Sequence, residues 1–265
     1  MSISVVKGQA YGNDFLLVPE SEVGGSDPAT LARAMCDRLH GIGADGLMLY
    51  AFDKDAVRMR LFNADGSASE VSGNGVRCLA ALAIRTRPGL KTVTVNTPAG
   101  PKVLELKGQD GDRLTFRASM GVPTDIRLVE FEAAGERVQA VALSVGNPQC
   151  VVFDDDLQPA KMHKLGPAIE HHQKFPNRTN VSFVHVETPA RIRILIWERG
   201  VGPTQASGTG ACGAAVAAAS HAGASRDIEV ISPGGSQRVE WLEEGLYLTG
   251  WASLVFEGRW LAVSS

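Results

Sequence analysis

The 265-residue sequence has few cysteines, and no two of them lie close together. The four, Cys36, Cys78, Cys150 and Cys212, form no CxxC motif, so neither a zinc site nor a disulfide framework is expected. A reducing cytoplasm is therefore the expected compartment.

The sequence also lacks a long hydrophobic run. The longest run of small apolar residues, 211–219, has about half the length of a membrane span. The N-terminus also lacks the basic and apolar regions of a secretory leader, so we expect no membrane association.

The sequence also lacks an excess of positive charge. It has 26 Lys and Arg against 29 Asp and Glu, a formal net charge of −3. A nucleic-acid-binding protein normally carries a basic patch or stripe, so this class is not expected. Hydrophobic residues make up 44% of the chain. This composition is typical of folded domains, and the length suits two of them.

One short segment occurs twice. Ser72-Gly73-Asn74-Gly75 and Ser207-Gly208-Thr209-Gly210 lie 135 positions apart, and each precedes an Ala-rich stretch. Upstream, 57–62 and 192–197 read as half-buried strands at the same offset, and Gly12-Asn13 matches Gly146-Asn147 at an offset of 134. The repeat predicts two homologous α/β halves, related by a pseudo-twofold axis, with the site between them. We expect one half to span 1–117, completed by a last strand at about 252–265, and the other to span 118–251.

The repeated segment has a chemistry of its own. Each Ser is expected to cap the N-terminus of a helix, and each Gly lets the backbone approach a ligand closely. A helix N-terminus carries partial positive charge and free N–H groups, so it attracts a carboxylate or a phosphate. Two such termini facing one cleft would form a clamp for an anion.

Three other motifs are weaker. Residues 208–213 spell GxGxxG, but a ten-residue loop separates them from the preceding strand, which argues against a dinucleotide site. Glu170-His171-His172 could supply metal ligands, although an exposed polar helix end is the simpler interpretation. Asp154-Asp155-Asp156 is more typical of a solvated turn than of a calcium loop.

Eight short motifs occur in order along almost the whole chain. They are Gly12-Asn13-Asp14-Phe15, Gly41-Ile42-Gly43-Ala44-Asp45-Gly46, Phe62-Asn63-Ala64-Asp65-Gly66-Ser67, Gly73-Asn74-Gly75-Val76-Arg77-Cys78, Gly146-Asn147-Pro148, Asn180-Val181, Glu198-Arg199-Gly200-Val201-Gly202 and Gly208-Thr209-Gly210-Ala211-Cys212. Together they resemble the diaminopimelate epimerase family.

The resemblance implies an α+β fold in which each half is a mostly antiparallel sheet wrapped around a central helix. It implies a cofactor-independent, homodimeric isomerase of the lysine and peptidoglycan precursor pathway, which converts LL- to meso-diaminopimelate. Two cysteines of such enzymes act on opposite faces of the substrate Cα. By motif position, the substrate-binding side chains are Asn13, Asn63, Asn147, Asn180, Glu198 and Arg199, and the backbone donors belong to Gly73, Asn74, Gly208 and Thr209.

The sequence departs from the family at the centre of the site. Ser72 and Ser207 occupy the positions of the two catalytic cysteines, and Gln149 replaces a histidine. A serine hydroxyl is a far weaker acid than a thiol and needs an adjacent general base, and Gln149 does not titrate. Glu198 remains as a possible carboxylate base, so Ser72, Ser207 and Glu198 are the candidate catalytic residues. We expect epimerisation to be very slow or absent.

Three interpretations of the function stay open. The chain is an epimerase-like isomerase with impaired or altered catalysis, a diverged amino-acid enzyme such as a β-eliminase or another racemase, or a non-catalytic amino-acid-binding protein. A laboratory replacement of both cysteines is a further alternative, but it leaves Gln149 unexplained. Gly46 stands where some relatives have a Gln that helps to define the pocket, so the distal end of the substrate is less constrained.

Overall fold

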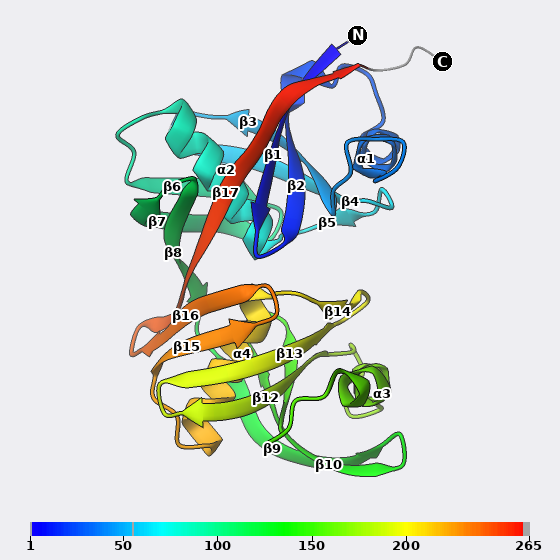
Figure 1. The fold of residues 1–265 in the computed structure, drawn as a ribbon, viewed down its shortest axis with the longest axis vertical. Helices are drawn as coiled ribbons and strands as arrows, with labels where there is room; N and C mark the ends of the chain where they lie inside the picture. The colour runs from blue at the N-terminus through cyan, green and yellow to red at the C-terminus, as the bar shows by residue number, and fades with distance from the viewer. Residues whose placement is uncertain (1, 55, 262–265) are drawn as a thin grey trace. The chain divides into compact units, whose positions relative to one another are not determined.

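The structure is a computed structural model that describes residues 2–54 and 56–261. The chain forms two compact units (Figure 1). Unit 1 consists of the residues up to Ala118 and those from Trp251 onward, and unit 2 is Ser119–Gly250. Both units combine helices with a mostly antiparallel sheet, which confirms the predicted α+β class. In the described part of the chain, no helix is long and apolar enough to cross a membrane.

Unit 1 is a sheet that surrounds the long helix α2 and carries the shorter helix α1 (Figure 1). Its elements are β1 (Ser2–Ala10), β2 (Asn13–Pro19), the 3-10 turn η1 (Glu20–Glu22), α1 (Pro28–Cys36), β3 (Gly46–Phe52), β4 (Val57–Asn63), β5 (Ala68–Ser69), α2 (Gly73–Thr86), β6 (Thr92–Thr97), β7 (Gly100–Asp110), most of β8 (Arg113–Gly121) and the last part of β17 (Gly245–Leu261).

Unit 2 repeats this order with α4 as the central helix and α3 as the shorter one. Its elements are β9 (Thr124–Ala133), β10 (Glu136–Ser144), β11 (Pro148–Phe153), α3 (Pro159–Glu170), β12 (Asn180–Thr188), β13 (Arg191–Glu198), β14 (Gly202–Thr204), α4 (Gly208–His221), β15 (Asp227–Ser232), β16 (Gly235–Leu242) and the first part of β17.

The repeat extends to the register of the strands. In unit 1, β4 runs parallel to β6 with Val57 opposite Val95. In unit 2, β13 runs parallel to β15 with Ile192 opposite Val230, which is the same pairing displaced by 135 positions. Both parallel pairs are joined through the central helix of their unit, as a crossover connection requires. The sequence repeat is therefore a repeat of structure.

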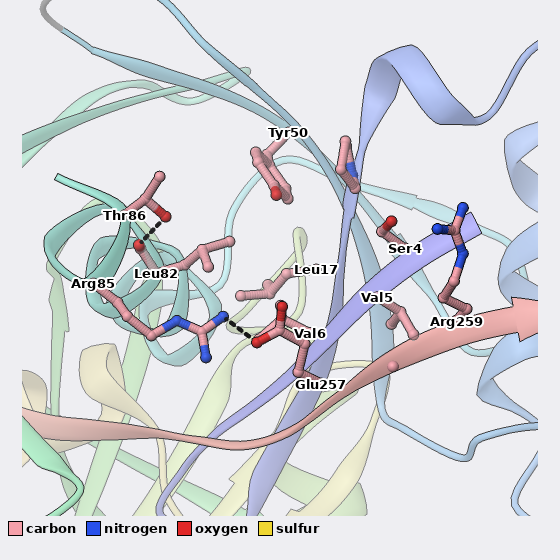
Figure 2. A pocket seen from close by; sticks show the side chains of 12 residues that line it. Ser4, Val5, Val6, Leu17, Tyr50, Leu82, Arg85, Thr86, Glu257 and Arg259 are labelled. Atoms are coloured by element: carbon pink, nitrogen blue, oxygen red, sulfur yellow. Dashed lines mark hydrogen bonds and ion pairs between the residues drawn. The ribbon is translucent and has the colours of Figure 1, made fainter. Parts of the chain in front are cut away.

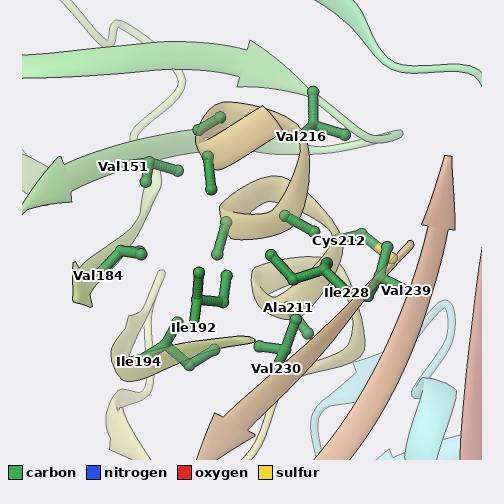
Figure 3. Close-up of a cluster of buried hydrophobic side chains, with 14 of the residues drawn as sticks. Val151, Val184, Ile192, Ile194, Ala211, Cys212, Val216, Ile228, Val230 and Val239 are labelled. Carbon is green, nitrogen blue, oxygen red and sulfur yellow. The ribbon is translucent and has the colours of Figure 1, made fainter. Parts of the chain in front are cut away.

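The central helix α4 is buried because it is apolar on every side. In α4 the side chains of 210–218 are all buried, and the surrounding strands place Val151, Ile194, Ile228 and Val239 against them (Figure 3). Burial of one such valine, for example Val216, stabilises the fold by about 1.5–3 kcal/mol. The small Ala and Gly side chains of α4 allow the strands to approach closely, so the helix and its N-terminus are held firmly in the unit.

Candidate active site

Both repeated serines cap their helices as predicted. The Ser72 Oγ accepts a hydrogen bond from the Gly75 N–H at the start of α2, at 3.2 Å. The Ser207 Oγ accepts one from the Gly210 N–H at the start of α4, also at 3.2 Å. The N–H groups of the first helical residues have no partner within their own helix, so each terminus offers donors to an anion.

In unit 1, the side chains at the start of α2 form a chain of hydrogen bonds. The Asn74 Nδ2 donates to the Asn13 Oδ1 at 3.2 Å, and Arg77 donates to the Asn74 Oδ1. The Asn13 Nδ2 in turn donates to the Asp45 Oδ2 at 2.7 Å. These contacts fix the orientation of both amides, so two of the predicted binding residues, Asn13 and Asn74, are brought together beside Ser72.

A network of ion pairs holds Asp45, the hydrogen-bond acceptor of Asn13, in place. Asp14, which is buried, pairs with Lys7 at 2.9 Å and with Arg38 at 2.8 Å, and Arg38 also pairs with Asp45. Burial raises the pKa of Asp14, but the hydrogen bonds and charges of Arg38 and Lys7 outweigh that effect and hold its pKa below the usual value. Asp45 therefore remains in place as the acceptor for Asn13.

Asn63 lies apart from this group. It is exposed at the end of β4, and its Nδ2 donates to the Ser67 Oγ at 2.9 Å. Among the residues that the structure describes, no hydrogen bond joins Asn63 to Ser72, Asn13 or Asn74. Its place in the substrate site stays a prediction.

In unit 2, the corresponding group is assembled differently. The Asn147 Nδ2 donates to the Thr209 Oγ1 at 3.3 Å, and the Gln149 Nε2 donates to the Asn147 Oδ1 at 2.7 Å. Gln149 is 1% exposed, and its Oε1 has no hydrogen-bond partner in the described part of the chain. Its side chain packs against Gly213, where an added Cβ would lie 2.9 Å from the Gln149 Cγ. The side chain at position 149, where the resemblance implies a histidine, is thus a buried amide.

Glu198 is the last residue of β13, and its carboxylate faces the hydroxyl groups of Ser207 and Thr204. Burial raises the pKa of Glu198, and the nearby hydroxyls of Ser207 and Thr204 offset the effect only in part. A carboxyl with a raised pKa is better matched to proton transfer near neutral pH than an exposed one. Glu198 is therefore the titratable group that lies beside Ser207.

Asn180 holds the backbone next to Glu198. Its Oδ1 accepts a hydrogen bond from the Arg199 N–H at 3.0 Å, and its Nδ2 donates to the Pro148 carbonyl at 3.0 Å. The Arg199 guanidinium is exposed and donates to the Asn177 carbonyl at 3.0 Å. In unit 2 the predicted residues therefore fall into two connected groups, one at the start of α4 and one at the end of β13.

The structure corrects one part of the prediction for Glu170-His171-His172. The segment does end helix α3, and His171 is exposed as predicted, but Glu170 itself is 3% exposed. Within the described residues, no group of three His, Cys, Asp or Glu side chains could hold a metal ion. The Glu170 carboxylate instead accepts hydrogen bonds from the Trp197 Nε1 at 2.8 Å and from the Gly200 N–H at 2.9 Å.

The four cysteines all lie buried in the interior of the protein. Burial raises the pKa of Cys36, Cys78 and Cys150 to about 12, so these thiols stay protonated and unreactive.

Unit 1 also contains an open cavity of about 400 Å³ that is remote from the predicted residues (Figure 2). Its walls include Tyr50, Leu82 and the ion pair between Arg85 and Glu257, whose Nη2 and Oε2 lie 3.1 Å apart. None of the predicted site residues lines this cavity. The size of a cavity alone therefore does not locate the site.

Comparison with known proteins identifies the family. The family model described as diaminopimelate epimerase matches residues 5–126 and 141–255. A diaminopimelate epimerase of Desulforudis audaxviator is 44% identical over 96% of this chain and 98% of its own, and one of Carboxydothermus hydrogenoformans is 37% identical over 96% and 98%. A solved structure from Pseudomonas aeruginosa, described as a predicted epimerase, has a TM-score of 0.74 at 13% identity and covers 98% of this chain and 100% of its own. The chain therefore belongs to the diaminopimelate epimerase family of isomerases.

Proposed function

We propose that this chain binds diaminopimelate and transfers the proton at its Cα, and that the two serines impair this reaction relative to the thiol enzymes of the family. The observation that carries the proposal is the proximity of Glu198 to the Ser207 hydroxyl at the N-terminus of α4, because it brings a titratable carboxylate near the hydroxyl at the position of a family thiol.

The binding step uses groups that are already held in position. The N–H groups at the starts of α2 and α4 suit the α-carboxylate of an amino acid, because a helix N-terminus stabilises negative charge. Arg199 supplies a further cation, and the amides of Asn13, Asn147 and Asn180 supply donors and acceptors. Asn63 belongs to the same proposed set. Together these groups recognise the α-carboxylate and the α-amino group that every α-amino acid carries.

The chemical step removes the Cα proton on one face and returns a proton on the other. In the proposed reaction, Glu198 accepts the proton directly or through the Ser207 hydroxyl, and the electron pair left on Cα delocalises into the substrate carboxylate. The helix N–H groups stabilise the charge that develops there. Ser72 or a water molecule donates the proton to the opposite face. Because neither hydroxyl is an effective acid or base by itself, the rate is low.

A second function is favoured by a specific feature. Ser72, Ser207 and the non-titrating Gln149 together replace three proton-handling groups, whereas the amides and Arg199 are retained. This combination also suits a protein that binds an amino acid without inverting it, or one that acts on a related substrate by β-elimination.

Incubation of the protein with LL-diaminopimelate in D₂O tests the proposal. We expect slow incorporation of deuterium at Cα, measured by NMR, together with binding measured by calorimetry. Binding without any exchange would support the binding protein, and release of an elimination product would support the diverged enzyme. Absence of binding at millimolar concentration would contradict the proposed function.

A further inference from the structure

We infer that Glu170 is a positioning residue for substrate binding, because its buried carboxylate fixes the turn that presents Glu198 and Arg199. The inference rests on the proposed function in naming the substrate, and it concerns a residue outside the motifs that carry the family resemblance. It explains a charged side chain that would otherwise have no role in the interior of unit 2.

The two oxygens of Glu170 bind on either side of the residues that they position. The Oε2 accepts from the Trp197 Nε1 at 2.8 Å, one residue before Glu198. The Oε1 accepts from the Gly200 N–H at 2.9 Å, one residue after Arg199. A single carboxylate therefore holds both ends of the turn, and the positions of Glu198 and Arg199 depend on it.

The same carboxylate also controls the loop that holds the Arg199 side chain. The Glu170 Oε1 lies 3.2 Å from the Arg178 Nη1. The neighbouring Asn177 carbonyl accepts the hydrogen bond from the Arg199 guanidinium. Arg178 has a φ of +56°, a conformation that non-glycine residues adopt only when their surroundings hold them there. Glu170 thus connects the end of α3 with both the backbone and the side chain of Arg199.

A carboxylate at the position of Glu170 is energetically unfavourable unless other groups stabilise it. Glu170 is the last residue of α3, where the partial negative charge of the helix disfavours an acidic side chain. Its side chain is 4% exposed, and burial of a carboxylate is costly unless hydrogen bonds satisfy it. Burial raises the pKa of Glu170, but the hydrogen bonds from Trp197 and Gly200, with the charges of His171 and Arg178, outweigh it and the pKa lies below its usual value. The donors that keep the carboxylate ionised are those of the turn that it holds.

Glu170→Ala and Glu170→Gln test the inference in the full chain. We expect Glu170→Ala to weaken the binding of diaminopimelate at least tenfold by calorimetry. Glu170→Gln keeps one acceptor oxygen of the right shape, so its affinity should lie between that of Glu170→Ala and the unchanged chain. Val239→Ala is the matched control, since it removes buried apolar volume from β16 of the same unit, in a core cluster that does not include Trp197. It should lower the melting temperature but leave the dissociation constant of the folded protein unchanged.

A double-mutant cycle with Arg199→Ala distinguishes positioning from a general loss of stability. If Glu170 acts through this turn, Glu170→Ala should have a much smaller effect on affinity when Arg199 is already absent. Hydrogen exchange without ligand gives an independent measurement, because the Gly200 and Arg199 amides should lose protection in Glu170→Ala.

The outcomes separate the inference from the proposed function. Equal affinity of Glu170→Ala and the unchanged chain, or additive effects in the cycle, would overturn the inference while the proposed function stands. Unchanged exchange at Gly200 would overturn it even if diaminopimelate does not bind. Absence of binding by the unchanged chain, with faster exchange in Glu170→Ala, would contradict the proposed function and leave Glu170 as the residue that fixes the turn.

Discussion

The helix starts at Ser72 and Ser207 share a backbone plan but have different surroundings. Ser72 is half-buried beside two amides, Asn13 and Asn74, that are oriented by charged neighbours. Ser207 is 5% exposed, and its hydroxyl faces the carboxylate of Glu198. The residue that corresponds to Glu198 in unit 1, by the 135-position repeat, is Asn63, which is exposed and does not titrate.

This difference indicates that the two halves of the repeat have different roles. A duplicated fold supplies two equivalent anion-binding termini, but inversion at a carbon atom needs a base on one face and an acid on the other. In the described residues, the Glu198 carboxylate lies near the Ser207 hydroxyl, whereas the corresponding residue on the Ser72 side is the amide Asn63. We therefore expect changes on the two sides to have unequal effects.

The largest effect is expected when both sides regain a thiol. Ser72→Cys combined with Ser207→Cys should raise Cα–H exchange of diaminopimelate strongly, since each positioned acid or base typically contributes about 10²–10⁴-fold. Either single change should give less, and Gln149→His added to the pair should raise the rate further by supplying a group that titrates near neutral pH.

The same exchange assay provides the control for this pair. A chain with unchanged serines that already turns over at a typical enzymatic rate, around 1–10³ s⁻¹, would show that the serines are not limiting. A double Cys variant that binds diaminopimelate but exchanges no proton would place the defect in positioning instead of acidity.

The comparison is sharpened by removing the carboxylate from one side. Glu198→Gln should lower the residual exchange about 10²-fold or more if this group is the base. Asn63→Ala, at the corresponding position of unit 1, should weaken binding without lowering exchange at saturating substrate. Equal losses of exchange in the two variants would show that the halves are equivalent after all.

Loss of the helix caps should affect stability more modestly. Ser72→Ala and Ser207→Ala should each lower the free energy of unfolding by about 0.5–2 kcal/mol, because each leaves an N–H group at a helix start without its acceptor. We expect the larger loss for Ser207→Ala, since Ser207 is buried and its hydroxyl also offsets part of the burial cost of the half-buried Glu198. Denaturant titrations of both variants check the order, and a larger loss for Ser72→Ala would contradict it.

The smallest effect concerns the pH dependence of stability. The pKa of Glu198 is raised by folding, so the unfolded chain loses this proton first, and the free energy of unfolding falls as the pH rises from about 4.3 through the raised value. Glu198→Gln should remove this decline.

Glu170 has a lowered pKa, so its contribution to stability changes with pH in the opposite direction. The difference in the free energy of unfolding between Glu170→Gln and the unchanged chain should diminish as the pH falls below about 4.3. Urea unfolding between about pH 2 and 8 measures both, and parallel profiles for the two variants would contradict the assignment.

Much of the fold could be predicted because short segments of the sequence determine it. The Ser-Gly-x-Gly segments, their offset and the Ala-rich stretches after them were sufficient to predict two capped, buried helices in a repeated fold, as the structure has them. The buried state of α4 follows from its apolar composition alone.

The supporting residues could not be predicted in the same way. Glu170 and Gly200 are 30 positions apart, and only the folding of α3 against β13 brings them together. Asp45 and Arg77 lie within recognised motifs, but nothing in the motifs indicates that they orient Asn13 and Asn74. The one signal for Glu170 was a charged residue at the end of a helix pattern, and a pattern of that kind is more often solvent-exposed.

The course of β17 has a consequence for how the protein is made. Its first part pairs with β16 in unit 2, and its last part, from Trp251 onward, pairs with β1 in unit 1, with Trp260 opposite Ile3. During synthesis, β1 emerges from the ribosome long before β17, which is one of its two partner strands. Unit 2 can therefore complete its sheet before unit 1, although it comes later in the chain. Until then β1 has an unpaired edge, so a stalled or prematurely terminated nascent chain should be prone to aggregate through this strand.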